Sequence, residues 1–157
     1  MVRELRSRSP EETARIGEQI GRSVRAGEVI GIVGELGAGK TCFVRGLARG
    51  LALDPDVVYS PSFTLVAEHH GQLTLHHIDL FRLGEPVTME EADEIGLREY
   101  LDPSGVTVIE WASRLENGRE ESTLWVEIDL LEDGSRNLRL SASAKRGEEL
   151  LAALGSE

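Results

Sequence analysis

Gly34-Glu35-Leu36-Gly37-Ala38-Gly39-Lys40-Thr41 decides the fold, because this stretch satisfies the pattern G-x-x-x-x-G-K-[ST] at every fixed position. In such a loop the glycines let successive backbone N–H groups point into one concavity, which binds an anion. Lys40 is expected to reach the β- and γ-phosphates of a nucleoside triphosphate, and the Thr41 hydroxyl to bind Mg²⁺. Cys42 is expected to lie against the nucleotide as a small side chain rather than a reactive thiol. We therefore predict that residues 34–42 form a nucleotide-binding site.

The sequence on both sides of this loop has the context that phosphate binding requires. Residues 28–33 form a nearly continuous apolar run, which is typical of a strand buried on both faces of a parallel sheet. After the loop, apolar residues recur at helical spacing between Phe43 and Leu51, so the positive end of a helix is expected to point at the phosphates. This order disfavours a chance glycine-rich turn. It predicts an α/β protein with a three-layer fold like that of the P-loop NTPases, built on a central, mostly parallel sheet plus β-hairpins.

The remaining elements follow from periodicity and turn chemistry. Ser9-Pro10-Glu11-Glu12 offers a helix start with a capping residue, a proline at the first helical position and a glutamate for a capping box. Asp133-Gly134 is a tight-turn signal between two strand-like runs. We expect strands at residues 2–8, 57–59, 63–69, 73–80, 106–109, 124–131 and 137–142, and helices at residues 9–25, 88–93, 96–101 and 147–154.

Length and composition indicate one acidic domain covering residues 1–157. With 17 Lys and Arg against 28 Asp and Glu, the net charge is −11, which is unsuited to holding nucleic acid by neutralising its phosphates. The single cysteine excludes an internal disulfide and fits a reducing compartment. The start of the chain lacks the apolar core of a signal peptide, and no apolar run approaches the ~20 residues of a membrane span. We expect a cytoplasmic protein with no membrane contact.

Two carboxylates are positioned to complete a hydrolytic site. Asp79 lies late in the run 73–80 and Glu110 ends the run 106–110, so both stand at the carboxyl end of an expected strand. In α/β sheets, ligands bind beyond the carboxyl ends of the strands. A P-loop ATPase needs an acid near Mg²⁺ and a group that orients the attacking water. We therefore predict that Lys40, Asp79 and Glu110 act together in hydrolysis.

Other classes of nucleotide-binding enzyme have motifs that this sequence lacks. It has no Asn-Lys-x-Asp tetrad for guanine and no Leu-Ser-Gly-Gly-Gln stretch of a transporter ATPase, and it is too short for a hexameric motor with its lid. A small-molecule kinase on the same scaffold stays open as an alternative. Such an enzyme usually carries an Arg-bearing lid, whereas Arg82 is the only arginine between Arg49 and Arg98. The other alternative is a non-catalytic module in which ATP only organises a docking surface.

Four histidines in the expected hairpin raise the question of a metal site. If the chain turns at Gly71-Gln72, His70 pairs with Leu73 and no two histidines face each other, so solvated or hydrogen-bonded histidines are favoured over zinc ligands. The same register puts Thr64 opposite Asp79, where its hydroxyl would stand beside the candidate acid. We therefore add Thr64 to the predicted catalytic residues. The histidines are His69, His70, His76 and His77.

The chain contains four signature segments: 34–41, Ser60-Pro61-Ser62-Phe63-Thr64-Leu65-Val66, His77-Ile78-Asp79-Leu80-Phe81-Arg82-Leu83 and Ile109-Glu110-Trp111. In their order and spacing they resemble the bacterial TsaE (YjeE) ATPases of tRNA threonylcarbamoyladenosine biosynthesis. The resemblance runs from the helix at Ser9 to the terminal helix. Four motifs in register are far more specific than a phosphate loop alone.

This resemblance implies a small ATPase that uses ATP and Mg²⁺. Its implied partners are the threonylcarbamoyl-transferase subunit and its pseudo-enzyme partner, proteins of the TsaD–TsaB type. Hydrolysis would support turnover of that complex, while another subunit performs the transfer. Since the chain is strongly acidic, we expect it to contact tRNA only indirectly, through these partners.

The resemblance also implies roles for individual residues of this chain. Thr41 and Glu110 would bind Mg²⁺, and Asp79 would act in hydrolysis. Residues 60–66, which include Thr64, would behave as a switch near the γ-phosphate.

Around the nucleotide, the resemblance implies that Trp111 lies beside the site and that Ser9 and Thr13 border the base. Two positions depart from the family pattern. Ser62 stands where the family usually has Thr, and since a hydroxyl remains, its role is expected to survive. Ala112 stands where the family commonly has Pro, so the loop after Trp111 need not have the family's shape, whereas the expected role of Glu110 is unchanged.

Overall fold

A computed structural model of the chain describes residues 1–58, 66–81, 83, 87–94, 96–97, 101 and 103–155. Its strands are β1 (Val2–Ser7), β2 (Val29–Val33), β3 (Val66–His69), β4 (Leu75–Asp79), β5 (Val106–Glu110), β6 (Leu124–Leu130) and β7 (Arg136–Ser141). These described strands form one sheet in the order β1-β7-β6-β2-β5-β4-β3. The central strands β6, β2, β5 and β4 are parallel, whereas β1, β7 and β3 are antiparallel to their neighbours. The predicted α/β fold with a parallel centre and flanking hairpins is confirmed.

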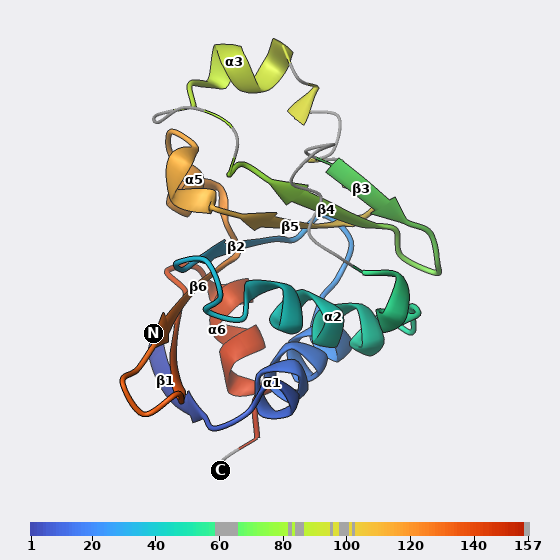
Figure 1. Cartoon of the computed structure of the whole chain (residues 1–157). Coiled ribbons are helices and arrows are strands. Elements are labelled where there is room, and N and C mark those ends of the chain that lie inside the picture. The colour runs from blue at the N-terminus through green and yellow to red at the C-terminus, as the bar shows by residue number, and fades with distance from the viewer. Residues whose placement is uncertain are drawn as a thin grey trace.

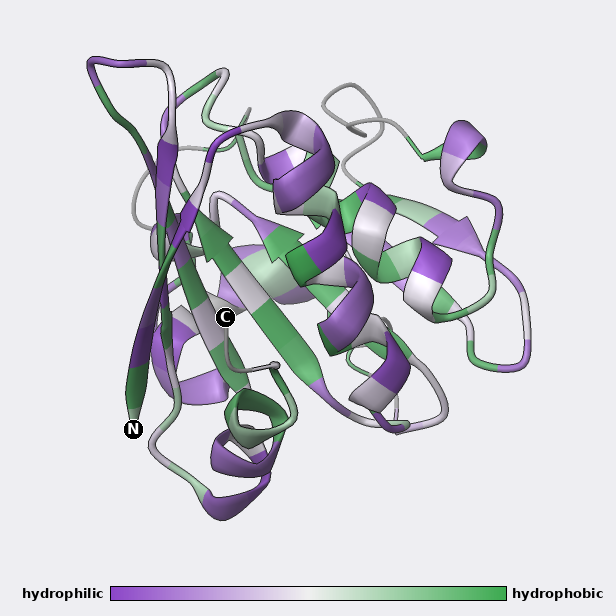
Figure 2. Ribbon diagram, turned by 90° about the horizontal axis from the view of Figure 1, so that it is seen from below, coloured by the Kyte–Doolittle hydropathy of each residue, from purple (hydrophilic) through white to green (hydrophobic). Residues whose placement is uncertain are grey.

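Helices cover both faces of this sheet (Figure 1). They are α1 (Pro10–Ser23), α2 (Lys40–Gly50) and α6 (Lys145–Ala152) on one face, and α3 (Met89–Glu94) and α5 (Gly118–Glu121) on the other. One apolar core, which includes Phe43 and Leu47, lies on the first face, and a second, which includes Leu97 and Ile109, lies on the other. Figure 2 shows hydrophobic strands inside and hydrophilic residues on the outer surfaces of the helices. None of the described helices is long and apolar enough to cross a membrane.

Strand β2 lies in the middle of the sheet because its residues are apolar toward both faces. It pairs in parallel with β5 on one side and with β6 on the other. In the β4–β5 ladder, Asp79 pairs with Glu110, and in the β2–β5 ladder Glu110 pairs with Ile32. Parallel strands end at the same edge of a sheet, so both acids reach the edge where the chain leaves β2.

Helix α1 begins as the sequence predicts. The backbone N–H of Glu12 donates to the Ser9 hydroxyl at 3.1 Å, and the Glu12 carboxylate accepts from the backbone N–H of Arg8 at 2.7 Å. The helix ends at Ser23, two residues before the predicted end, because the backbone becomes extended at Val24. The start of the helix is therefore set by local capping chemistry.

Helices α1 and α2 lie side by side and touch through glycines (Figure 1). A Cβ atom at Gly46 would lie 1.8 Å from the carbonyl oxygen of Ala14, a separation that no real side chain tolerates. Only glycine permits this approach. It brings α1 against the helix whose first residue is Lys40, so α1 braces the phosphate-binding helix.

Most predicted elements are present, and their described ends lie within three residues of the predicted ones. The strand predicted at 57–59 is wrong for its described residues, because Pro55–Val57 form a 3-10 turn, η1, and Val58 is in no strand; Tyr59 lies outside the described residues. The Asp54 side chain accepts from the N–H of Asp56 at 2.9 Å, and Pro55 suits the first position of such a turn. Residues 98–100 of the helix predicted at 96–101, and residues 63–65 of the strand predicted at 63–69, lie outside the described residues.

The β3–β4 hairpin has a different register from the predicted one. His69 pairs with Leu75, whereas the predicted register, with His70 opposite Leu73, would pair it with Thr74. Leu73 leaves the ladder and packs against the core, so the connection spans residues 70–74 instead of a two-residue turn. The register that would place Thr64 opposite Asp79 is therefore wrong, and Thr64 itself lies outside the described residues.

Candidate functional site

The phosphate loop, residues 34–39, connects the end of β2 to the start of α2. Gly39 has a φ of 107°, in the left-handed region, so the last glycine of the motif is required to turn the chain into the helix. The loop forms part of a pocket of about 360 Å³, which unites most of the predicted site residues. Its described lining residues are Leu36, Gly37, Gly39, Lys40, Thr41, Cys42, Asp79, Phe81, Glu110, Trp111 and Arg136.

Lys40 is held inside the loop by backbone carbonyls. Its Nζ atom donates to the carbonyl oxygen of Gly34 at 2.6 Å and to that of Glu35 at 2.8 Å. Burial lowers the pKa of Lys40, and the negative charges of Glu110, Asp79 and Glu35 offset part of this effect. The ammonium group is thus surrounded by acceptors and acids, and a bound phosphate can replace the two carbonyls.

Asp79 and Glu110 stand together at the ends of β4 and β5, and each is 2% exposed. The backbone N–H of Phe81 donates to Asp79 Oδ1 at 2.8 Å. Glu110 Oε2 lies 2.5 Å from His77 Nε2. Two neighbouring buried carboxylates repel each other, so this site favours a cation, either the ammonium group of Lys40 or a metal ion.

The oxygen atoms of the pocket suit Mg²⁺ in particular. This ion takes oxygen ligands, usually one or two carboxylates completed by waters and phosphate oxygens. Glu110 and the hydroxyl-bearing Thr41 line the same pocket, and Asp79 lies beside Glu110 in the register. These residues therefore fit the metal that a nucleoside triphosphate brings with it.

Trp111 is fixed next to the loop lysine. Its backbone is left-handed, with a φ of 58°, a conformation that is uncommon for a bulky residue and is found preferentially at functional sites. Its ring centroid lies 5.0 Å from that of Phe81 and 4.5 Å from Lys40 Nζ. The Arg114 guanidinium lies 4.8 Å from the same ring. Cation–π contacts with two basic groups thus hold the indole ring at the pocket wall.

Two arginines that the sequence did not single out contact residues of the site. Arg136 of β7 donates from Nε to the carbonyl oxygen of Ala38 at 2.8 Å. Arg114, in the turn η2 (Ala112–Arg114), donates to the carbonyl oxygen of Phe81, in the turn that follows β4. The sequence offers a weak indication of Arg114, because it lies three residues after the Ile-Glu-Trp segment. It offers no indication of Arg136, because the position of Arg136 depends on β6 pairing with β2.

Several predicted residues lie outside the described lining of this pocket. Thr13 is fully buried, and its hydroxyl lies 2.7 Å from that of Ser7, while the Ser9 hydroxyl caps α1. Their expected contact with the base stays a prediction, as does the role of Thr64. The remaining loop residues contribute carbonyl oxygens that hold Lys40 and Arg136; these are Gly34, Glu35 and Ala38.

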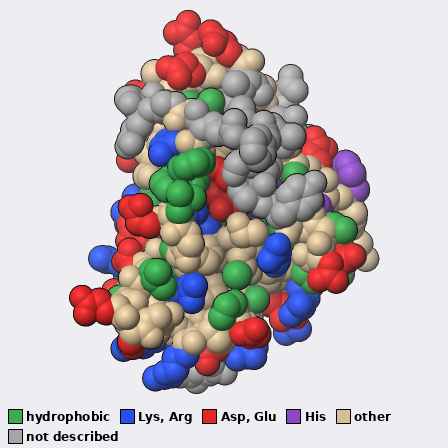
Figure 3. All heavy atoms as spheres, viewed as in Figure 1, with side chains coloured by type: hydrophobic (Ala, Val, Ile, Leu, Met, Phe, Trp, Pro, Cys, Tyr) green, Lys and Arg blue, Asp and Glu red, His purple; other side chains and the backbone are tan. Residues whose placement is uncertain are grey.

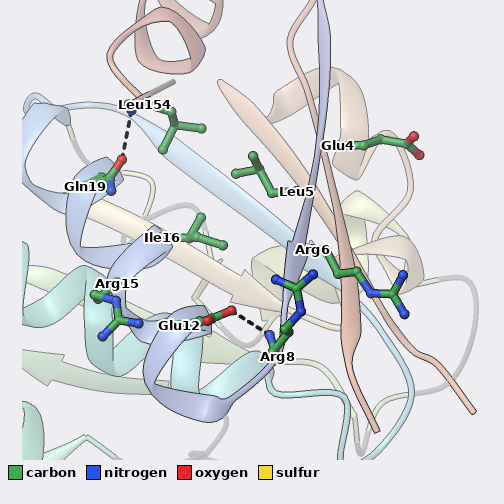
Figure 4. Close-up of a pocket in the computed structure, with 10 residues that line it drawn as sticks. Glu4, Leu5, Arg6, Arg8, Glu12, Arg15, Ile16, Gln19 and Leu154 are labelled. Carbon is green, nitrogen blue, oxygen red and sulfur yellow. Dashed lines mark hydrogen bonds between the residues drawn. The ribbon is translucent and has the colours of Figure 1, made fainter. Parts of the chain in front are cut away.

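A second groove of about 360 Å³ lies between β1, α1 and the end of the chain that follows α6 (Figure 4). Leu5, Ile16 and Leu154 point toward one another inside it, and charged side chains stand around them. These charges have both signs, with Glu4 and Glu12 among several arginines. The groove shares no described lining residue with the phosphate-loop pocket.

Comparison with known proteins identifies, over most of the chain, the same family that the four signature segments resemble. A protein-family model described as "Threonylcarbamoyl adenosine biosynthesis protein TsaE" matches residues 7–138. A tRNA threonylcarbamoyladenosine biosynthesis protein TsaE from Treponema pallidum is 42% identical over 86% of this chain and 97% of its own length. The protein of the same name from Bacillus subtilis is 35% identical over 92% of this chain and 89% of its own. The crystal structure of Bacillus subtilis YdiB superposes with a TM-score of 0.74 at 32% identity, covering 97% of this chain and 94% of that one.

Proposed function

Because the chain belongs to the TsaE family, we propose that it binds ATP with Mg²⁺ at the phosphate loop, hydrolyses the ATP, and so supports threonylcarbamoyladenosine biosynthesis in tRNA. One observation carries this proposal. Lys40, Asp79 and Glu110 line a single pocket, although they come from α2, β4 and β5. A phosphate-binding lysine beside two buried carboxylates is the set of groups that phosphoryl transfer to water requires. The missing Asn-Lys-x-Asp tetrad favours ATP over GTP.

In this proposal the loop amides and Lys40 bind the phosphates. The Lys40 ammonium now donates to two neutral carbonyls, and a phosphate oxygen is a stronger, charge-assisted acceptor. Since burial lowers the pKa of Lys40, the negative phosphates act in the opposite direction and keep the lysine protonated. Arg136 meanwhile holds the loop through Ala38, so the amides keep their orientation.

The carboxylates have separate roles in this proposal. Thr41 and Glu110 would hold Mg²⁺, which supplies charge stabilisation to the phosphates when it is bound. Asp79 would accept a hydrogen bond from the attacking water and so orient it. Its carboxylate is already fixed by the N–H of Phe81, and its burial limits the access of other waters.

The partners we propose are the threonylcarbamoyl-transferase subunit and its pseudo-enzyme partner, through which the chain would reach tRNA. The charge distribution supports an indirect contact with RNA. The net charge is −11, and the exposed acids of α3 gather at one end of the molecule (Figure 3). Such a surface repels a phosphate backbone. These acids are Glu90, Glu91, Asp93 and Glu94.

The test is repeated tRNA modification by the transferase complex, measured together with ATP hydrolysis, for the wild type, Lys40→Ala and Glu110→Ala. The matched control is Lys145→Ala, which removes the only other lysine of the chain, exposed at the start of α6. Loss of either site residue is expected to slow hydrolysis about 100-fold or more, since each supplies charge stabilisation to the transition state. Modification should then stop after about one round, whereas Lys145→Ala should match the wild type.

Two outcomes would contradict this function. Repeated modification by both site variants, with hydrolysis abolished, would leave a module in which ATP only organises a docking surface. Formation of ADP that depends on a small alcohol or acid, and not on the transferase complex, would identify a small-molecule kinase.

A further inference from the structure

His77 is a buried polar residue whose role the site chemistry has not yet used. It lies on β4, two residues before Asp79 and therefore on the same face of the strand. Its side chain is fully buried, and its Nε2 atom lies 2.5 Å from Glu110 Oε2. We propose that His77 is a positioning residue that holds the Glu110 carboxylate in the orientation needed to bind Mg²⁺. This inference rests on the proposed function, because it assigns Glu110 to the metal.

The hydrogen-bonding pattern fixes which ring nitrogen acts. Nε2 faces a carboxylate oxygen, which can only accept, so Nε2 carries the hydrogen. Nδ1 has no partner among the described residues, and a hydrogen there would be buried without an acceptor. His77 therefore presents one N–H group, from Nε2, to one oxygen of Glu110.

This contact determines what Glu110 can do with its other oxygen. With Oε2 bonded to His77, the carboxylate cannot rotate freely, and Oε1 is left for a cation. Glu110 is also the largest favourable charge acting on Lys40, and it lies beside the like-charged Asp79. Without His77, repulsion from Asp79 and attraction to Lys40 would turn the Glu110 side chain toward the lysine. His77 thus keeps Glu110 available to the metal.

Three substitutions at His77 test the contact. The side-chain amide nitrogen of glutamine can occupy the place of Nε2, whereas that of asparagine lies near Nδ1, and leucine offers no donor. His77→Gln should therefore restore what His77→Leu and His77→Asn lose. The control is His76→Gln, a neighbouring buried histidine that faces the opposite side of the sheet. Because the glutamine and asparagine variants differ only in reach, the comparison holds even if the leucine variant fails to fold.

Two affinities are measured for each variant. Electron paramagnetic resonance gives the affinity of the ADP-bound protein for Mn²⁺, which is the probe for Mg²⁺. Calorimetry gives the affinity for ADP without metal. Loss of a residue that orients a metal ligand typically weakens metal binding about 10–100-fold, and we expect this loss for His77→Asn and His77→Leu. His77→Gln and His76→Gln should bind Mn²⁺ like the wild type. The affinity for ADP without metal should be the same in all of these variants. A general loss of structure would lower it.

A double-mutant cycle with Glu110→Ala shows whether His77 acts through Glu110. We expect His77→Asn to cause no further loss of Mn²⁺ affinity once Glu110 is replaced. An equal further loss in that background, or wild-type Mn²⁺ affinity in His77→Asn, would overturn the inference. The proposed function fails separately, if Glu110→Ala itself leaves Mn²⁺ affinity unchanged.

Discussion

Replacing Arg136 with alanine is expected to weaken nucleotide binding about tenfold while the fold stays intact. The Nε atom of Arg136 donates to the carbonyl oxygen of Ala38 at 2.8 Å. Its Nη2 atom lies 3.4 Å from the carbonyl oxygen of Gly37. A hydrogen bond from a charged donor contributes roughly 1.5–3 kcal/mol. Since Arg136 is partly exposed and its second contact is long, the low end of this range applies, and about 1.5 kcal/mol corresponds to about tenfold in affinity.

The effect should appear in binding because the loop, once released, no longer holds its amides in the geometry that phosphate needs. Calorimetric titration with ADP measures it, and a thermal melt checks the fold. Arg136→Lys keeps the charge but not the planar group, so it should recover only part of the affinity. Arg139→Ala, an exposed arginine on the same strand, serves as the control. Wild-type ADP affinity in Arg136→Ala would refute this reasoning, and full recovery in Arg136→Lys would show that charge alone acts.

Three further predictions concern stability and the state of the loop. Burial lowers the pKa of His69 below its ordinary 6.5, so the unfolded chain binds this proton first and stability falls as the pH drops from 6.5 through the lowered value. In urea unfolding between about pH 7 and about pH 5, His69→Gln should flatten this fall, and exposed His70→Gln should flatten it less. Gly46→Ala should cost about 1–3 kcal/mol, seen as a lower Tm, because its Cβ would meet a carbonyl of α1, and an unchanged Tm would contradict that contact. With the other tryptophan replaced by phenylalanine, Trp111 fluorescence should change on ADP binding as the loop lysine leaves its position 4.5 Å from the ring, and a silent signal would argue against that exchange.

The phosphate loop and the two acids could be predicted because their signals are local. Residues 34–41 lie next to one another in the chain, between a strand and a helix that can be identified from a few residues each. Asp79 and Glu110 end apolar runs, and parallel strands end at one edge of a sheet. Neither inference needed the pairing of distant segments.

Arg136 and the contact between His77 and Glu110 could not be predicted, because they depend on pairings between distant strands. Arg136 reaches the loop only because β6 adds to β2 in parallel and carries β7 with it. His77 meets Glu110 only because β4 lies beside β5 with one particular register. Since β4 and β5 are parallel, no short turn connects them, and the register cannot be predicted from local turn chemistry.

The error in the β3–β4 register has a physical cause of the same kind. Gly71-Gln72 has the composition of a tight turn, so local chemistry favoured a two-residue loop. Burial of Leu73 against the core outweighed this preference and lengthened the connection. Tertiary packing thus overrode the turn signal, and with it the predicted partner of Asp79.

Single-turnover hydrolysis of bound ATP by Asp79→Asn tests the central claim most directly. Asparagine keeps the size of the side chain and an oxygen that accepts the Phe81 N–H, but it loses the charge that orients water. The account predicts that this variant binds ATP with Mg²⁺ as the wild type does. Its rate of hydrolysis should be at least about 100-fold lower. Hydrolysis of the bound ATP at the wild-type rate would show that the pocket formed by Lys40, Asp79 and Glu110 is not the hydrolytic site.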